Sequence, residues 1–389
     1  MKPSFCSLLY REISDLFRDP WLFSVVSWIP LLLYGLMWWI FSAGLAMDIP
    51  IGVVDLDRSS ISRALVRHYE ASPSLTVSDH FLDIHQGSRA LKSGKIYALV
   101  VLPADLEKLT KRGLPPQVTA FVNSQYLLIG RVVSTALLQA QGTYTTRVEV
   151  MKNLTLAPPV IDHALSAALP IATQTTPLFN SGKNYAQFLV SAILPAIWQI
   201  VMIIATILSL AFVRRTYSVS TWLGTAPVRS MLSKMLFLGS LFLLHGIFFF
   251  SFMYVFLGWP MHGNWQIIIL GQILTILASF SVASIIFFLA GDTVRCMSLS
   301  AAYAAPALAF MGVTFPVSDM TLPALLWRKL IPVNHYIEIQ FAQVNDGIVS
   351  AAALLPLKNL LFFLLPFCFM LYLAHRLSAK QSVSKKEPV

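Results

Sequence analysis

Apolar residues gather in six long runs along the chain, and polar residues fill the segments between them. A helix needs about twenty mostly apolar residues to cross a bilayer. Runs of roughly this length lie at 21–46, 185–213, 235–257, 266–290, 296–315 and 354–375. The pattern therefore predicts a membrane all-α bundle of six transmembrane helices.

The polar segment after the first run, residues 47–184, alternates between strand and helix patterns. Strand-like runs lie at Ile49–Leu56, Leu75–Val77, Tyr97–Leu102 and Gln117–Val122. Helical patterns lie at Ser59–Glu70, Ile84–Leu91 and from Tyr126 to about Asn153. Asp57 or Ser59 is a candidate cap for the first of these helices. Such alternation predicts an α/β domain outside the membrane, with helices packed on a small sheet.

Three shorter segments complete the predicted organisation. Residues 1–20 carry apolar side chains at helical spacing between charges and end at Pro20, which predicts an amphipathic helix on the membrane surface. The apolar run that follows is too long for a signal peptide, so we expect it to be a retained anchor. Segment 319–348 is too polar to span and is broken by prolines, which favours two short re-entrant helices. The transmembrane domain would cover 185–377, and 378–389 would form a tail.

Lys and Arg beside the apolar runs predict the orientation, because cytosolic flanks of membrane proteins are enriched in them. With both ends of the chain inside, the short inner segments hold Lys2, Arg11, Arg18, Arg214, Arg215, Arg229, Lys234, Arg295, Arg376, Lys380, Lys385 and Lys386. The short outer segments hold Arg328, Lys329 and Lys358. Both termini are therefore expected in the cytosol and the α/β domain outside, which in a bacterium is the periplasmic side of the inner membrane.

Composition narrows the function classes. Hydrophobic residues make up 56% of the chain and charged residues only 12%, about half of the usual share in soluble domains. The net charge of +10 lies mostly beside the apolar runs, so it favours membrane sidedness over nucleic-acid binding. Neither Gly94-Lys95 nor Gly182-Lys183 has the sequence of a phosphate-binding loop. We therefore expect no ATP hydrolysis, and no catalytic residue, in this chain.

A few polar residues suggest other chemistry. Asp79, His80, Asp83 and His85 could bind a metal, but their spacing matches no standard site and a solvated turn explains them as well, so no metal is predicted. His245 and Gln199 lie inside apolar runs, and His245 is better explained as a hydrogen-bond partner between helices than as a proton relay. The scarcity of intramembrane charge weighs against an ion-coupled transporter.

Four stretches resemble the type-2 ABC exporter permeases, the branch with a large periplasmic domain between the first two spans. They are Ile51–Leu65 with Ala90–Pro103, Pro177–Asn180, Arg214–Arg229, and Phe315–Pro323 with Ile331–Tyr336. The third stretch is similar to the family's cytosolic coupling helix, although Thr216 and Thr221 stand where acidic residues are usual and Ser218 replaces a Gly. The fourth is similar to the family's outer re-entrant hairpin.

The resemblance implies roles for particular residues. Coupling loop 214–234 would contact a cytosolic ATPase through Arg214, Arg215, Thr216, Trp222, Thr225 and Arg229. The re-entrant hairpin would contain Pro316, Pro323, Pro332, His335 and Glu338. ATP and Mg would bind only to the partner subunit, so this chain would need no cofactor.

The sequence thus predicts the permease subunit of an ATP-driven exporter for a hydrophobic or amphipathic substrate. It would pair as a homodimer or with a sister permease, and a periplasmic adaptor protein is a further candidate partner. The alternative is a membrane-anchored sensor or scaffold that reads a ligand through the periplasmic domain. A lipid-modifying enzyme is a weaker alternative, because only His335 and Glu338 offer reactive groups near the membrane face.

Overall fold

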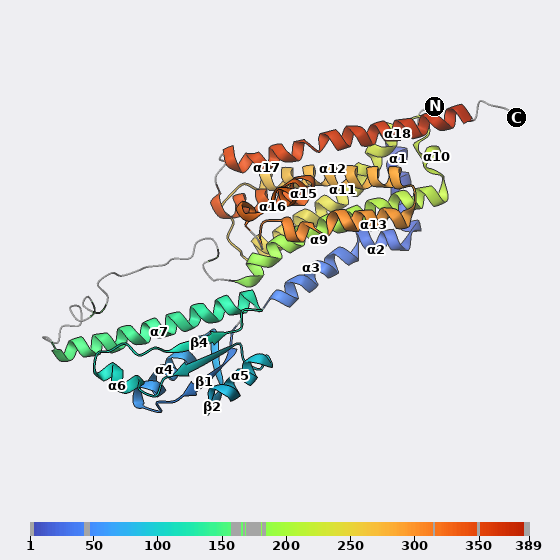
Figure 1. The fold of residues 1–389 in the computed structure, drawn as a ribbon. Coiled ribbons are helices and arrows are strands. Elements are labelled where there is room, and N and C mark those ends of the chain that lie inside the picture. Colours follow the sequence, from blue (N-terminus) through green and yellow to red (C-terminus); the bar gives the residue numbers. More distant parts are fainter. Residues whose placement is uncertain are drawn as a thin grey trace. The chain divides into compact units, whose positions relative to one another are not determined.

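The computed structural model describes residues 4–42, 47–156, 165, 168, 180, 184–313, 316–347 and 351–384. The chain divides into two compact units, one formed by Met1–Gly44 with Pro177–Val389 and the other by Leu45–Thr176. The first unit is helical, and the second contains the sheet (Figure 1). Each unit is described by itself below.

The helical unit begins with a short surface helix and continues through long apolar helices. Its elements are α1 (Phe5–Arg18), α2 (Pro20–Val26), α3 (Trp28–Phe41), α9 (Tyr185–Thr216), α10 (Val219–Leu223), α11 (Pro227–Ser251), α12 (Trp265–Ala290), α13 (Thr293–Ala304), α14 (Ala307–Phe310), α15 (Leu322–Leu330), α16 (Pro332–Phe341), α17 (Ala351–Leu361) and α18 (Leu364–Ser384). Helix α11 continues into a π-helical turn, Phe252–Phe256, and α16 into another, Ala342–Asp346.

Five helical stretches of the described chain are long and apolar enough to cross a membrane. They are Pro20–Phe41, Ala186–Thr216, Pro227–Phe256, Trp265–Ala290 and Leu354–Ala379. These coincide with five of the six predicted runs, although positions 43–46 of the first run lie outside the described residues. The last helix continues to Ser384, so most of the predicted tail 378–389 extends α18, and 385–389 lie outside the described residues. The protein is therefore a multi-pass membrane protein.

The fifth predicted run, 296–315, is not one continuous helix, so it is not confirmed as a span. Helix α13 ends at Ala304, and the four-residue α14 follows after a turn at Ala305 and Pro306. Proline has no backbone N–H and its ring disfavours a continuing helix, which explains the break. Positions 314–315 lie outside the described residues. Helix α13 still packs along α9 and α12, and α14 contacts α9 and α16.

The predicted hairpin 319–348 contains two short helices, α15 and α16, preceded by a 3-10 turn at Val317–Asp319. Pro323 and Pro332 each stand in the first turn of a helix, where the missing N–H costs nothing. The first helix is largely exposed, whereas α16 is buried against α9, α12 and α17. The predicted pair of short helices is confirmed, and its position in a bilayer stays a prediction.

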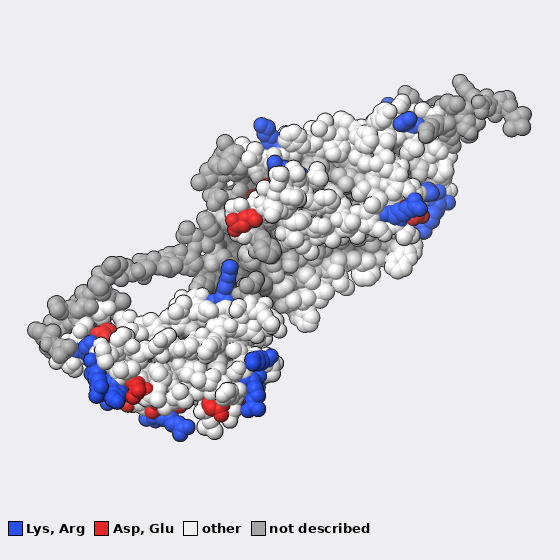
Figure 2. Space-filling view, in the orientation of Figure 1, with Lys and Arg blue, Asp and Glu red and all other residues white. Residues whose placement is uncertain are grey.

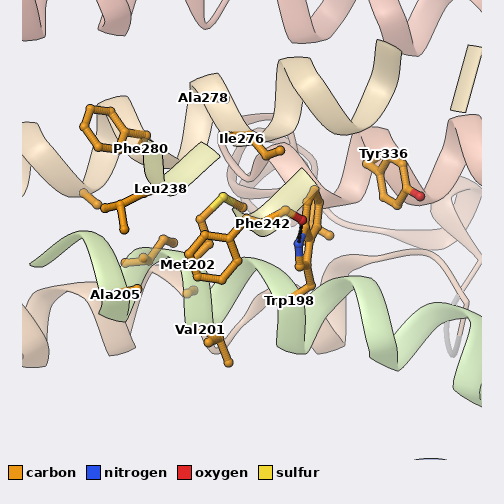
Figure 3. Packing of buried hydrophobic residues seen from close by; sticks show 14 of the residues in the cluster. Trp198, Val201, Met202, Ala205, Leu238, Phe242, Ile276, Ala278, Phe280 and Tyr336 are labelled. Carbon is orange, nitrogen blue, oxygen red and sulfur yellow. Dashed lines mark hydrogen bonds between the residues drawn. The ribbon is translucent and has the colours of Figure 1, made fainter. Parts of the chain in front are cut away.

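The core of the helical unit centres on Trp198 of α9, which is fully buried (Figure 3). Its indole N–H donates to the carbonyl of Phe242 on α11 at 2.9 Å. The ring also packs against Phe249 of α11 and Tyr336 of α16, with centroids 6.0 and 5.8 Å away. One aromatic side chain therefore holds three helices around a common point.

Buried amide side chains join α16 to the helices around it. Gln199 of α9 accepts a hydrogen bond from the Val333 backbone N–H at 2.7 Å. Gln340 donates to the Ser191 carbonyl at 2.7 Å, and Gln272 of α12 donates to the Tyr336 hydroxyl at 3.0 Å. Hydrogen bonds of this kind replace water for polar groups in an apolar interior. They explain why the short helix α16 lies inside the unit rather than on its surface.

The second unit is α/β, with strands where the sequence pattern predicted them. Its elements are β1 (Ile49–Asp55), α4 (Ser60–Glu70), β2 (Leu75–Phe81), α5 (Ile84–Lys92), β3 (Ala98–Leu102), α6 (Leu106–Lys111), β4 (Thr119–Val122) and α7 (Leu127–Leu156). The sheet order is β2-β1-β3-β4; β1 pairs in parallel with β2 and β3, and β4 runs antiparallel to β3.

Both faces of the sheet are covered by helices. Ile51 and Val53 point to the side packed by α4 and α7, whereas Val54 points to the side packed by α5. Ser59 caps α4, its hydroxyl accepting from the Ser62 N–H at 3.1 Å, so of the two predicted candidates Ser59 is the cap. Ser62 in turn donates to the Asp55 carboxylate at the end of β1.

Candidate functional site

Lys and Arg side chains gather at the end of the helical unit where α9 ends, while the long sides of the helices show mostly uncharged residues (Figure 2). Arg214, Arg215 and Thr216 form the last turn of α9 and are exposed. Thr225 and Arg229 are exposed beside α10. We call these five residues the coupling surface. The structure thus places five of the six predicted contact residues on one exposed stretch of chain.

The short helix α10 is fastened to the long helices around it. It packs against α9, α11 and α18. The Ser378 hydroxyl of α18 donates to the Gly224 carbonyl, which follows α10, at 2.5 Å. Gly224 has a φ of +52° and a ψ of −140°, a backbone conformation that essentially only glycine adopts. The chain therefore turns sharply after α10 and enters α11 at Pro227.

Trp222 differs from the other predicted contact residues because it is buried, with 2% of its surface exposed. Its indole N–H donates to the Glu12 carboxylate of α1 at 3.2 Å. The Lys234 ammonium lies 5.1 Å from the ring centroid and the Arg11 guanidinium 5.5 Å, both in cation–π range. Its burial does not fit the direct partner contact that the resemblance implied. Trp222 instead packs inside the protein, behind the exposed residues of the coupling surface.

Glu12 and Lys234 form a buried ion pair between α1 and α11, with 3% and 0% of their surfaces exposed. The Lys234 Nζ lies 2.5 Å from Glu12 Oε2 and donates to the Ser209 hydroxyl of α9 at 2.6 Å. Together with Trp222, these residues form what we call the coupling cluster. Buried charges are costly unless they are paired and hydrogen-bonded, and this pair meets both conditions.

Two further acidic side chains extend the contact between α1 and α9. Asp15 accepts from the Tyr217 hydroxyl at 3.1 Å, and burial raises the pKa of its carboxyl more than this hydrogen bond lowers it. Asp19 caps α2 by accepting from the Trp21 and Leu22 N–H groups, and its other oxygen accepts from Arg215 at 2.8 Å. The exposed end of α9 is therefore anchored to the junction of α1 and α2.

Sequence reasoning placed Glu12 on a surface helix and Lys234 in a cytosolic flank, and so missed the coupling cluster. A signal for it was present: Lys234 lies well inside an apolar helix, and an ionisable residue in such a place requires a partner. The acidic side chains of α1 were the candidates for that partner.

Replacing Ser218 by glycine is expected to stabilise the protein by about 1 kcal/mol. Ser218 has a φ of +58°, a conformation strained for a side-chain-bearing residue. Its hydroxyl caps α10 at the Thr221 N–H, but exchanging a serine cap for glycine costs only a few tenths of a kcal/mol. Unfolding by SDS in mixed micelles measures the change. Ser220→Gly, inside α10, is the matched control and should destabilise; equal losses in both variants would refute the expectation.

The hairpin residues meet at a second polar contact. Arg328 of α15 is buried, donates to the Phe310 carbonyl of α14 at 2.6 Å, and forms an ion pair with Glu338 of α16. His335 lies 3.7 Å from the same carboxylate. The predicted residues His335 and Glu338 are therefore brought together, but Pro316 and Pro323 are exposed and lie outside this contact.

Asp79 and Asp83 have local partners, whereas His245, predicted to join helices through a hydrogen bond, has its Nδ1 buried without a hydrogen-bond partner among the described residues. Asp79 pairs with Lys95 at 2.9 Å, and Asp83 caps α5 at the Gln86 N–H. Within the described residues no group of three His, Cys, Asp or Glu side chains could hold a metal. Asn180 exchanges two hydrogen bonds with the Asn184 backbone at the start of α9, whereas 177–179 lie outside the described residues.

The comparison with protein families decides the classification. The family model described as ABC-2 family transporter protein matches residues 20–374. The chain belongs to the ABC-2 transporter family. No curated protein and no solved structure matches it. Membership in the ABC-2 family makes this chain a permease subunit of an ABC transporter and implies association with an ABC ATPase and with the membrane.

The match begins at Pro20 and ends at Ala374, so the ABC-2 family model covers four of the five candidate spans, most of the fifth, and the α/β unit between the first two. Helix α1, which supplies Glu12 to the coupling cluster, precedes the matched range. The predicted resemblance to an ABC permease is confirmed.

Proposed function

We propose that this chain is the permease subunit of an ATP-driven exporter that moves a hydrophobic or amphipathic substrate out of the cytoplasm or the inner membrane. ATP and Mg bind to a separate cytosolic subunit. Two membrane halves, identical or sister chains, pair to form the transport path, and a periplasmic adaptor protein is a further candidate partner. The coupling surface receives the ATPase.

One observation carries the proposal: an exposed basic surface lies directly over a buried cluster that joins α1, α9, α10 and α11. Arg214 and Arg229 offer cationic contacts on the outside, and Arg215, although exposed, is also paired with Asp19. Trp222, Glu12 and Lys234 connect the same segment to the long helices on the inside. A surface of this kind suits a partner with acidic side chains, because complementary charge guides association.

The packing supports a mechanical role for α10. A partner that pushes on the coupling surface displaces α10, and its contacts with α9, α11 and α18 pass the displacement to three long helices. Packed interfaces move between discrete arrangements rather than deforming gradually. ATP-driven closure of the ATPase thus changes how the two membrane halves meet, and the substrate is released on the side where its affinity is lower.

The proposed topology has six crossings, with both termini in the cytosol and the α/β unit on the periplasmic side. Helix α1 contacts the start of α11, and Ser378 of α18 contacts Gly224 after α10, so the first and the last helix of the described chain both reach the coupling end of the unit. A chain with both termini on the same side of the membrane must cross it an even number of times. The broken pair α13 and α14 adds a sixth crossing to the five continuous spans, and α15 with α16 forms the re-entrant hairpin.

Purification of the tagged protein from its native membranes in mild detergent is expected to bring down an ATP-binding subunit with ATPase activity. The triple variant Arg214→Ala/Arg215→Ala/Arg229→Ala should reduce the amount of this subunit about tenfold or more, because hot-spot arginines each contribute about 2 kcal/mol or more to an interface. Quantitative mass spectrometry of the purified complex measures the ratio.

Lys329→Ala/Lys358→Ala is the matched control, since both lysines are exposed and lie in segments predicted outside the cytosol. This variant should retain the subunit. Absence of any ATP-binding subunit, under conditions that preserve a known exporter complex, would contradict the proposal and favour a membrane-anchored sensor. Labelling of a Ser218→Cys variant from the periplasmic side of intact cells would contradict the proposed orientation.

A further inference from the structure

The α/β unit has three adjoining cavities along one face of α7. The α7 residues that line them are Ser134, Leu137, Leu138, Gln141, Tyr144, Thr145, Arg147, Val148, Glu149 and Met151. Residues three and four apart lie on the same side of a helix. At a rise of 1.5 Å per residue, this face is about 25 Å long. We call it the α7 groove.

The first cavity, between α7 and the β4 side of the sheet, has a volume of about 520 Å3 and an apolar lining. Val118, Ala120 and Val122 line one side, and Leu137 and Leu138 the other. Leu138 is 73% exposed, although it sits beside this apolar surface. An exposed leucine beside a hollow apolar lining suits an apolar ligand.

The middle cavity, about 220 Å3, shares Pro116, Val118 and Gln141 with the first. Leu106 of α6 and Leu114 of the following loop line its other side. Glu149 also lines it, but its carboxylate lies 3.6 Å from the Lys152 ammonium and is balanced there. The groove therefore continues past Gln141 with a mixed lining, in which Leu106 and Leu114 supply apolar surface.

The third cavity, about 410 Å3 between α4 and α7, has a cationic lining. Arg67 and His68 approach it from α4, and Arg147 approaches it from α7. It shares Tyr144 and Val148 with the middle cavity, and the Tyr144 hydroxyl ties α7 to the Ile61 carbonyl of α4. Neither arginine forms an ion pair with any residue in the described part of the chain. Two unpaired guanidinium groups at one opening suit an anionic group, which they can bind through several hydrogen bonds.

We propose that the α7 groove binds a single-chain anionic amphiphile, with its carboxylate or phosphate head between Arg67 and Arg147 and its acyl tail along the apolar cavities. Charge complementarity selects the head, and the length of the groove matches an extended acyl chain of medium to long size. The inference rests on the proposed function only in taking such an amphiphile as cargo or regulator of transport; binding itself needs no ATPase.

The test uses the full-length protein in phosphatidylcholine nanodiscs and a sixteen-carbon fatty acid that carries a diazirine on its tail. Irradiation followed by digestion and mass spectrometry is expected to place the label on α7, between Ser134 and Met151. Arg67→Gln/Arg147→Gln should raise the concentration of fatty acid that gives half-maximal labelling about tenfold or more. Hydrogen bonds to charged groups are stronger than those between neutral groups, and this variant removes them. Leu138→Glu should also reduce labelling, since it puts a carboxylate beside the path of the tail.

Arg131→Gln is the matched control, because Arg131 is exposed on the same helix but lines none of the three cavities. It should leave labelling unchanged. A fatty alcohol with the same diazirine tail should label the groove at least about tenfold less well. Equal labelling by the alcohol, full labelling of the arginine variant, or labelling confined to the helical unit would overturn the inference. Groove labelling without a co-purifying ATPase would refute the proposed function and leave the inference standing.

Discussion

Replacing Lys234 by methionine is expected to lower the free energy of unfolding by about 3–5 kcal/mol, because the buried Glu12 then loses its closest counter-charge. The remaining contacts of Glu12 are longer: the Trp222 N–H lies at 3.2 Å and the partly exposed Arg11 guanidinium at 3.6 Å. Equilibrium unfolding by SDS in mixed micelles measures the loss. ATPase activity of the purified complex should fall as well, because Lys234 no longer ties α11 to Glu12 of α1 and Ser209 of α9.

The double variant Glu12→Gln/Lys234→Met distinguishes two causes of the loss: the cost of leaving the Glu12 charge unpaired and the cost of losing the contacts of the Lys234 side chain. It removes both charges, and apolar or neutral replacement of a buried pair is often close to neutral, so most of the stability should return. Lys358→Met, at an exposed position of α17, is the control for the residue exchange itself and should change stability by less than about 0.5 kcal/mol. If the double variant were as unstable as Lys234→Met, the ion pair would not be the source of the loss.

Replacing Arg328 by methionine is expected to cost about 2–4 kcal/mol. The substitution removes the donor to the Phe310 carbonyl and the partner of Glu338, so α14, α15 and α16 lose their common contact. The cost lies below that of Lys234→Met because Glu338 has 34% of its side chain exposed and water can solvate it. The same unfolding measurement applies.

Arg328→Lys tests whether the directed hydrogen bonds of the guanidinium contribute to stability in addition to its charge. One ammonium cannot reproduce the two directed contacts of the guanidinium, so this variant should recover less than half of the loss. Lys329→Met, on the exposed side of the same helix, is the control and should be close to neutral. Full recovery by lysine would show that only the charge is needed at this position.

Local patterns were sufficient to predict the α/β unit. The strands and the helices α4, α5 and α7 follow from periodicity, and Ser59 was one of two candidate caps for α4, whereas the short helix α6 was not predicted. Five of the long apolar runs were predicted just as directly, because the number of consecutive apolar residues needed to cross a membrane can be counted along the sequence. The remaining run is not one continuous helix for a local reason too: Pro306 stands within it, and a hydropathy pattern does not show that proline lacks the backbone N–H a helix uses.

The candidate site depended on contacts that no local pattern contains. Trp222 and Glu12 are separated by 210 positions, so the burial of Trp222 follows from the way α1 packs rather than from its own neighbours. The exposed arginines at the end of α9 were predictable because a span must end in charge at the membrane surface. The α7 groove was not predicted, since its cavities depend on how helices separated in the sequence come together.

The distance along the chain between Glu12 and Lys234 has a consequence for biosynthesis. The two residues are 222 positions apart, so at usual rates of translation roughly 10–40 s pass between their synthesis. During this interval Lys234 is not yet available to pair with Glu12, and we expect α1 to lie at the surface of the membrane. Its side chains Tyr10, Ile13 and Phe17 are 76%, 42% and 70% exposed, which suits an anchor in the lipid headgroup region. The coupling cluster therefore closes only after α11 has been inserted, which makes its formation a late event in the maturation of the nascent permease.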